Sequence, residues 1–171
     1  SFGAVTVQLL AGERRAGHPP TPPDPRLRAV LALSPSARQP DAPPGLNQRF
    51  AHLRQPFMGI TGSRDDGMGL SDISAANREL PYRHAPAGLA GPDKYLLVFG
   101  GGNHLDFAGQ ASQAEAGMFA VRREPAVFHA SLLAASTAFW QAHLGLDTEA
   151  HRWLITDFPG RLRPTDRFEF K

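Results

Sequence analysis

Residues 94–104 read Lys-Tyr-Leu-Leu-Val-Phe-Gly-Gly-Gly-Asn-His, an apolar run that stops on three glycines, an asparagine and a histidine. Such a short, continuous apolar run, bounded by turn residues, is typical of a strand buried on both faces of a parallel sheet. Two similar runs precede it, Ala29–Leu33 and Phe57–Thr61, and the second ends in Gly62-Ser-Arg-Asp-Asp-Gly67. We therefore expect three parallel strands whose ends carry polar, glycine-rich turns.

Helical patterns alternate with these runs. Apolar residues recur at helical spacing over residues 1–11 and 126–144, and a shorter helix is predicted over 72–79, ending near Pro81. Strands in alternation with helices predict an α/β doubly wound domain. Because such sheets usually contain about 5–6 strands, we expect an N-terminal half, missing or on another chain, to supply further strands.

Composition excludes several classes of function. The chain has 171 residues, which suits one domain, and 18 basic residues face 16 acidic ones without forming a basic run. Nucleic-acid binding is therefore not expected. The absence of cysteine excludes disulfides and thiolate metal sites. No apolar run reaches the ~20 residues that span a bilayer, and no signal peptide is visible, so the compartment stays open.

Three features carry the chemistry, and they occur in the order serine, aspartate, histidine. Hydrolysis of an ester needs a nucleophile, a base and an acid that orients the base. Ser1-Phe-Gly3 opens a helix and matches the second half of the Gly-x-Ser-x-Gly nucleophile elbow. Asp65, Asp66 and His104 each follow a predicted strand. As structural alternatives, Ser1 would only cap a helix and the aspartates would only form a solvated turn. The order serine, aspartate, histidine, with the last two at strand ends, favours a catalytic triad.

Other functions can be read from the same residues. Asp65, Asp66, His104 and Asp106 offer hard metal ligands, but no His-x-x-x-His or similar spacing accompanies them, so no metal site is expected. If Ser1 is a mature N-terminus, its α-amine would serve as base in an N-terminal-nucleophile hydrolase. A non-catalytic binding module on a hydrolase scaffold is the third alternative.

The chain resembles the C-terminal half of bacterial serine α/β-hydrolases related to dienelactone hydrolases, chlorophyllase-like esterases and polyester hydrolases. The resemblance spans nearly the whole chain. The residues that carry it are Ser1–Ala4, Ala32–Pro35, Pro56–Asp66, Lys94–Val98, Gly102–Phe107, Thr137–Trp140 and Ala150–Leu154. It implies an α/β-hydrolase fold of which residues 1–171 form the C-terminal portion, with the N-terminal half of the domain in the same or a separate chain.

The resemblance also implies a role for each residue of the site. Ser1 would attack the carbonyl carbon of a carboxylic ester, and His104 would accept its proton. Asp65 or Asp66 would orient the imidazole, and the backbone N–H of Phe2 would donate to the oxyanion. A Gly-x-x-Asp turn counted from Gly62 selects Asp65, which we favour. Some relatives have a turn that is one residue longer, and that spacing would select Asp66.

The remaining expectations concern the substrate site. Residues near the carboxyl edge of such a sheet shape the pocket. On position alone, an acyl or alcohol site is expected to be lined by Met68, Leu70, Tyr82 and Leu105. No metal or organic cofactor is expected, and the substrate is an ester that the sequence does not name.

Overall fold

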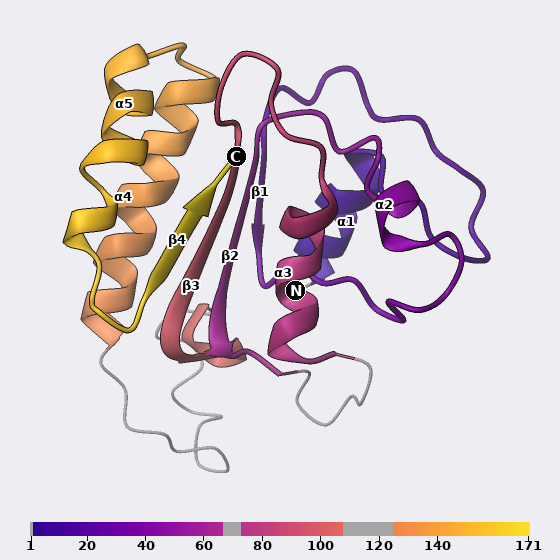
Figure 1. Ribbon diagram of the computed structural model, residues 1–171, viewed down its shortest axis with the longest axis horizontal. Helices are drawn as coiled ribbons and strands as arrows, with labels where there is room; N and C mark the ends of the chain where they lie inside the picture. Colours follow the sequence, from indigo (N-terminus) through magenta and orange to yellow (C-terminus); the bar gives the residue numbers. More distant parts are fainter. Residues whose placement is uncertain (1, 67–72, 108–124) are drawn as a thin grey trace.

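The computed structural model describes residues 2–66, 73–107 and 125–171. Within them, a four-stranded, mostly parallel open sheet lies between two groups of helices (Figure 1). The elements in chain order are α1 Phe2–Leu10, β1 Val30–Leu33, α2 Leu46–Arg49, β2 Phe57–Arg64, α3 Ala75–His84, β3 Lys94–Asn103, η1 His104–Phe107, α4 Pro125–His143, α5 Thr148–Thr156, η4 Pro159–Arg161 and β4 Arg167–Phe170. The chain therefore has a mixed α/β fold, as the alternating pattern predicted.

The sheet has the order β1-β2-β3-β4. β1 and β2 pair in parallel with Val30 opposite Phe57, and β2 and β3 pair in parallel with Phe57 opposite Lys94. These are the three strands that the apolar runs predicted. The fourth strand was not predicted: β4 runs antiparallel to β3, with Tyr95 opposite Phe170. The count of three strands is therefore corrected to four.

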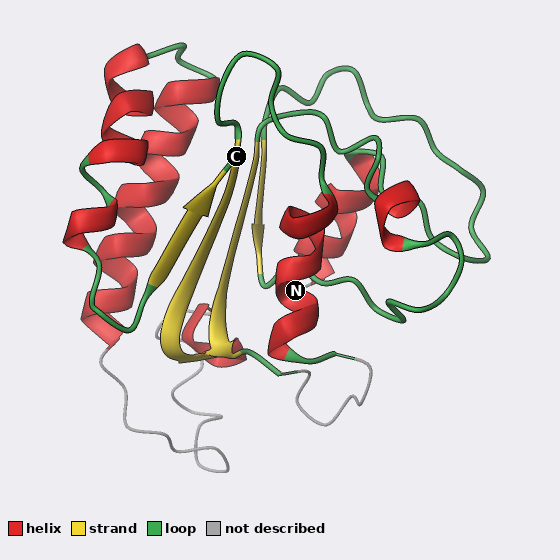
Figure 2. Cartoon of the chain, viewed as in Figure 1, coloured by secondary structure: helices red, strands yellow, loops and turns green. Residues whose placement is uncertain are grey.

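Both faces of the sheet are covered, which explains why the strands are continuously apolar. α4 and α5 lie on one face, and α1, α2 and α3 lie on the other (Figure 2). Along β3, the side chains of Tyr95, Leu97 and Phe99 join the core beneath α4 and α5, whereas Leu96 and Val98 join the opposite core. Side chains alternate between the faces of a strand, so a strand covered on both faces is apolar at most of its positions.

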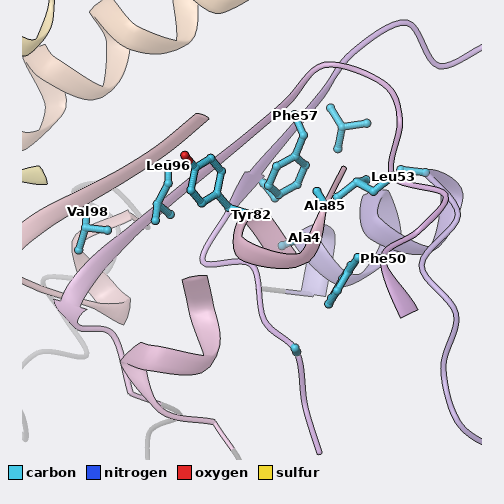
Figure 3. Packing of buried hydrophobic residues seen from close by; sticks show 12 residues of the cluster. Ala4, Phe50, Leu53, Phe57, Tyr82, Ala85, Leu96 and Val98 are labelled. Atoms are coloured by element: carbon cyan, nitrogen blue, oxygen red, sulfur yellow. The ribbon is translucent and has the colours of Figure 1, made fainter. Parts of the chain in front are cut away.

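Figure 3 shows the core between the sheet and the helices α1 and α3. Phe57 and Leu96 from the sheet pack with Tyr82 from α3, and each of the three is buried. From its position in the sequence, Tyr82 was predicted to line a substrate pocket. Its ring instead belongs to this core, with the Arg83 guanidinium 5.4 Å and the Lys171 ammonium 5.1 Å from its centroid. Burial against the sheet accounts for its aromatic character.

The helix α3 continues through Pro81 to His84, beyond its predicted end. A proline inside a helix removes the N–H that would bond the carbonyl four residues earlier. Here that carbonyl belongs to Asn77, and it accepts a hydrogen bond from the backbone N–H of Ala37 at 3.1 Å instead. The loop after β1 thus satisfies the acceptor that Pro81 leaves open, which lets the helix extend.

The helices α4 and α5 complete the fold. α4 matches the predicted helix over 126–144 closely. α5 begins at Thr148 and is capped by Asp147, whose carboxylate accepts from the backbone N–H groups of Glu149 and Ala150. Among the helices in the described ranges, none is both long and apolar enough to cross a membrane.

Candidate functional site

The carboxyl ends of β2 and β3 meet at one edge of the sheet. Asp65 directly follows β2, and His104 directly follows β3. The two strands approach so closely there that a Cβ built on Gly62 would lie 2.2 Å from the carbonyl oxygen of Gly102. Only a residue without a side chain fits that position. The glycines around these strand ends therefore permit the contact between the two turns.

Asp65 and His104 form a hydrogen-bonded pair. His104 Nδ1 lies 2.7 Å from Asp65 Oδ1, the Asp65 side chain is fully buried, and the His104 side chain is 20% exposed. Because an ionised carboxylate can only accept, Nδ1 must carry the proton that it donates. Neutral His104 then has its lone pair on Nε2, to which no group among the described residues hydrogen-bonds. This arrangement leaves Nε2 able to accept a proton.

Two further side chains hold the Asp65 carboxylate. The Thr61 hydroxyl donates to Asp65 Oδ2 at 2.8 Å, and Arg78 Nη2 lies 3.2 Å from Asp65 Oδ1. Burial by itself raises the pKa of Asp65. Hydrogen bonds from His104 and Ser34, with the charge of Arg78 and the Thr61 hydroxyl, outweigh burial and hold the pKa of Asp65 below its ordinary range. Asp65 is therefore a buried anion with a donor on each oxygen.

Ser34 completes the group from the end of β1. It is buried and has a φ of 53°, the left-handed region that costs a non-glycine residue energy. Its backbone oxygen accepts from Arg78 Nη1 at 3.1 Å, and its hydroxyl is one of the groups that lower the pKa of Asp65. Three adjacent strand ends thus contribute polar groups to one buried cluster.

The structure shows which of the two candidate aspartates contacts His104. Asp65 faces His104, whereas Asp66 is exposed and its Oδ1 accepts from the backbone N–H of Ala75 at 3.0 Å. Ala75 is the first residue of α3, where a carboxylate satisfies a free N–H group. The geometry therefore pairs Asp65 with the histidine and assigns Asp66 to the start of α3.

Several predicted residues lie outside the described part of the chain. These are Ser1, Met68 and Leu70, and for Leu105 only the backbone is described. Phe2 is the first residue of α1, and its side chain is 90% exposed. A backbone N–H in the first turn of a helix has no acceptor within that helix, so the N–H of Phe2 is open to an outside acceptor.

Three residues of the cluster, Ser34, Thr61 and Arg78, were not predicted from the sequence. Ser34 was counted only as the residue that bounds the first apolar run. Thr61 was counted only as the end of an apolar run, and Arg78 only as part of a weak helix. A signal existed for Thr61, since a hydroxyl that closes a buried strand needs a partner. Nothing in the local pattern marked Arg78, because its contacts come from residues 13 and 44 positions away.

No metal site was predicted, because the candidate ligands lack the spacing along the sequence that is typical of metal sites. In the described ranges, no group of three or more histidine or acidic side chains is arranged to hold a metal ion. Asp106, one of the possible ligands, accepts from the backbone N–H of Asn103 at 2.7 Å and so braces the turn that presents His104.

Comparison of the chain with models of protein families, with curated proteins and with solved structures found no match. The fold is mixed α/β with an open, mostly parallel sheet. Any function must rest on the geometry at the ends of β1, β2 and β3.

Proposed function

We propose that this chain belongs to a serine α/β-hydrolase that cleaves carboxylic esters through an acyl-enzyme. One observation carries the proposal: the buried Asp65 carboxylate accepts a hydrogen bond from His104 Nδ1 at 2.7 Å, at the carboxyl ends of adjacent parallel strands. Active groups in open parallel sheets gather at that edge. A histidine held in this way by an acid is the base that a serine nucleophile requires.

In the proposed reaction, His104 Nε2 takes the hydroxyl proton of Ser1 as the serine oxygen attacks the carbonyl carbon. The C–O bond to the alcohol then breaks, and His104 returns the proton to the leaving oxygen. Asp65 keeps the imidazole in the correct tautomer and stabilises its charged form. In the second half of the reaction, His104 takes a proton from water as the water oxygen attacks the acyl carbon. The bond to the Ser1 oxygen then breaks, the carboxylic acid is released, and His104 returns the proton to Ser1.

The position of α1 supports the choice of Ser1. α1 packs against the β1 region, where Gln8 exchanges hydrogen bonds of 3.1 and 3.2 Å with the backbone of Ser36. In Figure 1, α1 begins near the end toward which β1 points. A nucleophile elbow turns from a strand into a helix at this edge. The proposal gives one oxyanion contact to the Phe2 N–H, at the helix N-terminus.

The open edge of β1 also fits the proposal. β1 has β2 on one side, and no strand lies on its other side in the described part of the chain. The proposal assigns that edge to the N-terminal half of the hydrolase sheet, which would also carry the second oxyanion donor. The pocket that accepts the ester is proposed to lie beside the carboxyl ends of the parallel strands, where Asp65 and His104 meet.

The test uses the full-length protein and short-chain p-nitrophenyl esters. Ser1→Ala and His104→Gln should each lower kcat by a factor of about 10³ or more, because both remove the proton transfer that activates the nucleophile. A fluorophosphonate should label the wild type at Ser1. His129→Gln is the matched control, since among the described residues its ring is hydrogen-bonded to a backbone oxygen, that of Asp106 at 3.3 Å. Unchanged hydrolysis in folded Ser1→Ala or His104→Gln would reject the proposal.

A further inference from the structure

Arg78 lies in the middle of the buried cluster. Its side chain is 2% exposed, and it reaches from α3 to the ends of two strands. Nε donates to the backbone oxygen of Asp65 at 3.0 Å, and Nη1 donates to the backbone oxygen of Ser34 at 3.1 Å. Nη2 lies 3.2 Å from Asp65 Oδ1. The planar guanidinium presents donors in a rigid fork, so these contacts fix the Asp65 turn relative to β1.

The same guanidinium shares an acceptor with the histidine. Asp65 Oδ1 lies 2.7 Å from His104 Nδ1 and 3.2 Å from Arg78 Nη2, and the two nitrogens are 3.4 Å apart. Both nitrogens are donors, because Nδ1 carries the proton that it gives to the carboxylate. Two donors therefore converge on one oxygen and define where that oxygen must lie.

The charge of Arg78 also bears on Asp65. An isolated carboxylate in a buried site is costly, and a cation at close range offsets that cost. Burial lowers the pKa of the Arg78 guanidinium while the charges of Asp65 and Asp66 raise it, but an arginine remains a cation in proteins. Removing it would leave Asp65 buried with its negative charge less well balanced.

We propose that Arg78 is a positioning residue of the hydrolase, acting on the reaction by holding Asp65 in line with His104 Nδ1. This inference rests on the ester hydrolysis proposed above. Arg78 acts through Asp65, and no contact between Arg78 and a substrate is implied. Its two backbone contacts distinguish it from an ordinary ion pair, because they also tie the turn after β2 to the end of β1.

Arg49 provides a matched control for the loss of a buried arginine. It is also nearly buried, it donates through Nε to the buried Glu13 carboxylate at 2.7 Å, and it donates through Nη1 to the backbone oxygen of Arg38. Arg49 therefore carries the same kind of contacts as Arg78, but its partners are Glu13, in the segment after α1, and Arg38, in the loop between β1 and α2. Its removal should cost stability without moving Asp65.

The experiment compares Arg78→Met, Arg78→Lys and Arg49→Met in the full-length protein. Thermal unfolding, kcat and KM on a p-nitrophenyl ester, and the low-field proton resonance of the His104 Nδ1–H are measured for each. The resonance is assigned by its loss in His104→Gln. It reports the hydrogen bond to Asp65 whether or not the protein hydrolyses esters.

In Arg78→Met we expect kcat to fall by about 10- to 100-fold, since misplacing a catalytic group by about 1 Å costs a factor on that order. KM should change by less than about twofold, because no bound group is lost. The Nδ1–H resonance should shift or disappear. Arg78→Lys, which keeps the charge without the fork, should lie between Arg78→Met and the wild type. Arg49→Met should lower Tm and leave both kcat and the resonance unchanged.

Two results would overturn the inference. One is a folded Arg78→Met protein, or Arg78→Lys if the methionine variant does not fold, with wild-type kcat and an unchanged resonance. The other is an equal loss of kcat in Arg49→Met, which would show that general destabilisation explains the effect. A wild type without esterase activity would instead reject the proposed function. In that case the resonance would still show whether Arg78 holds the Asp65–His104 pair.

Discussion

His104 Nδ1 lies 2.7 Å from Asp65 Oδ1, although 39 residues separate them in the chain. The parallel pairing of β2 with β3 brings the two residues to the same edge of the sheet, and the contact between Gly62 and Gly102 lets the strand ends approach. The pair is therefore a consequence of the sheet.

The two aspartates should differ sharply when each is changed to asparagine. In Asp65→Asn the amide favours the wrong histidine tautomer, and kcat on a p-nitrophenyl ester should fall by about 10⁴-fold. Asp66→Asn keeps an oxygen that can accept from the Ala75 N–H, so kcat should stay near the wild-type value. Steady-state kinetics on both variants makes the comparison. A larger loss in Asp66→Asn would assign the orienting role to the other carboxylate.

The hydroxyl of Thr61 should stabilise the fold through the carboxylate that it contacts. Thr61→Val keeps the shape of the side chain but removes the 2.8 Å hydrogen bond to Asp65 Oδ2. The free energy of unfolding should fall by about 1–3 kcal/mol, the usual cost of a buried group that loses its partner. Urea denaturation measures this change. Thr61→Ser, which retains the hydroxyl, should lose clearly less, and equal losses would contradict the explanation.

Asp65 should also shape the acid stability of the protein. Its pKa is lower in the folded chain than in the unfolded chain, so the unfolded state takes up protons first as the pH falls. The stabilisation is present above the ordinary aspartate pKa of about 4 and is lost as the pH drops through the lower folded value. Unfolding measured from pH 5 to pH 2 should show this loss. Asp65→Asn should be less stable at pH 5, and the gap should narrow toward pH 2.

His143, on the helix α4, is expected to add a second pH dependence to the stability of the protein. Burial and the charge of His151 lower the pKa of His143 to about 4, and its Nε2 lies 3.0 Å from the Tyr95 hydroxyl. An unfolded histidine binds its proton near pH 6.5. Because the unfolded state binds the proton first, the contribution of His143 to stability should be constant above about pH 7 and should fall from about pH 6.5 to pH 4.

His143→Gln should remove the part of this slope that lies between pH 6.5 and pH 4. Thermal unfolding of both proteins at closely spaced pH values measures the difference. Glutamine can still donate to the Tyr95 hydroxyl, which separates the loss of titration from the loss of the hydrogen bond. The same slope in both proteins would show that His143 is not the group responsible.

The close approach of the two strand ends predicts a strong effect of a single methyl group. Gly62→Ala would place a Cβ 2.2 Å from the Gly102 carbonyl oxygen, so β2 and β3 must separate there. We expect a lower Tm, and a loss of kcat because Asp65 moves away from His104. Gly160→Ala is the control, since no atom of the described residues lies within 4 Å of its added Cβ. A Gly62→Ala protein with wild-type Tm and kcat would contradict the observed packing.

Local patterns predicted the elements that are regular over many residues. The parallel strands and the helix α4 were found because continuous apolar runs and helical periodicity mark elements that are buried along their length. β4 was missed although its four residues alternate between polar and aromatic, because so short a stretch was not recognised as the pattern of a half-buried strand. Its place depends on contacts such as that of Phe168, which stacks on Tyr95 with ring centroids 6.1 Å apart.

The end of α3 and the place of Tyr82 were decided by packing. Pro81 normally ends a helix, but the Ala37 N–H satisfies the carbonyl that it leaves open. Tyr82 lies in a stretch predicted to line a pocket, yet one turn of helix places its ring in the core. Both outcomes depend on segments distant in the sequence, which a local pattern does not contain.

The sequence by itself determined that polar turns would follow the buried strands and that Asp65, Asp66 and His104 would lie in them. The reason is that hydrophobicity and turn chemistry act over a few neighbouring residues. Only the tertiary structure decided that Asp65 is the partner of His104, and that Thr61, Ser34 and Arg78 surround it. Hydrogen bonds of this kind join residues from different strands and from α3, so they exist only once the sheet has formed and α3 has packed on it.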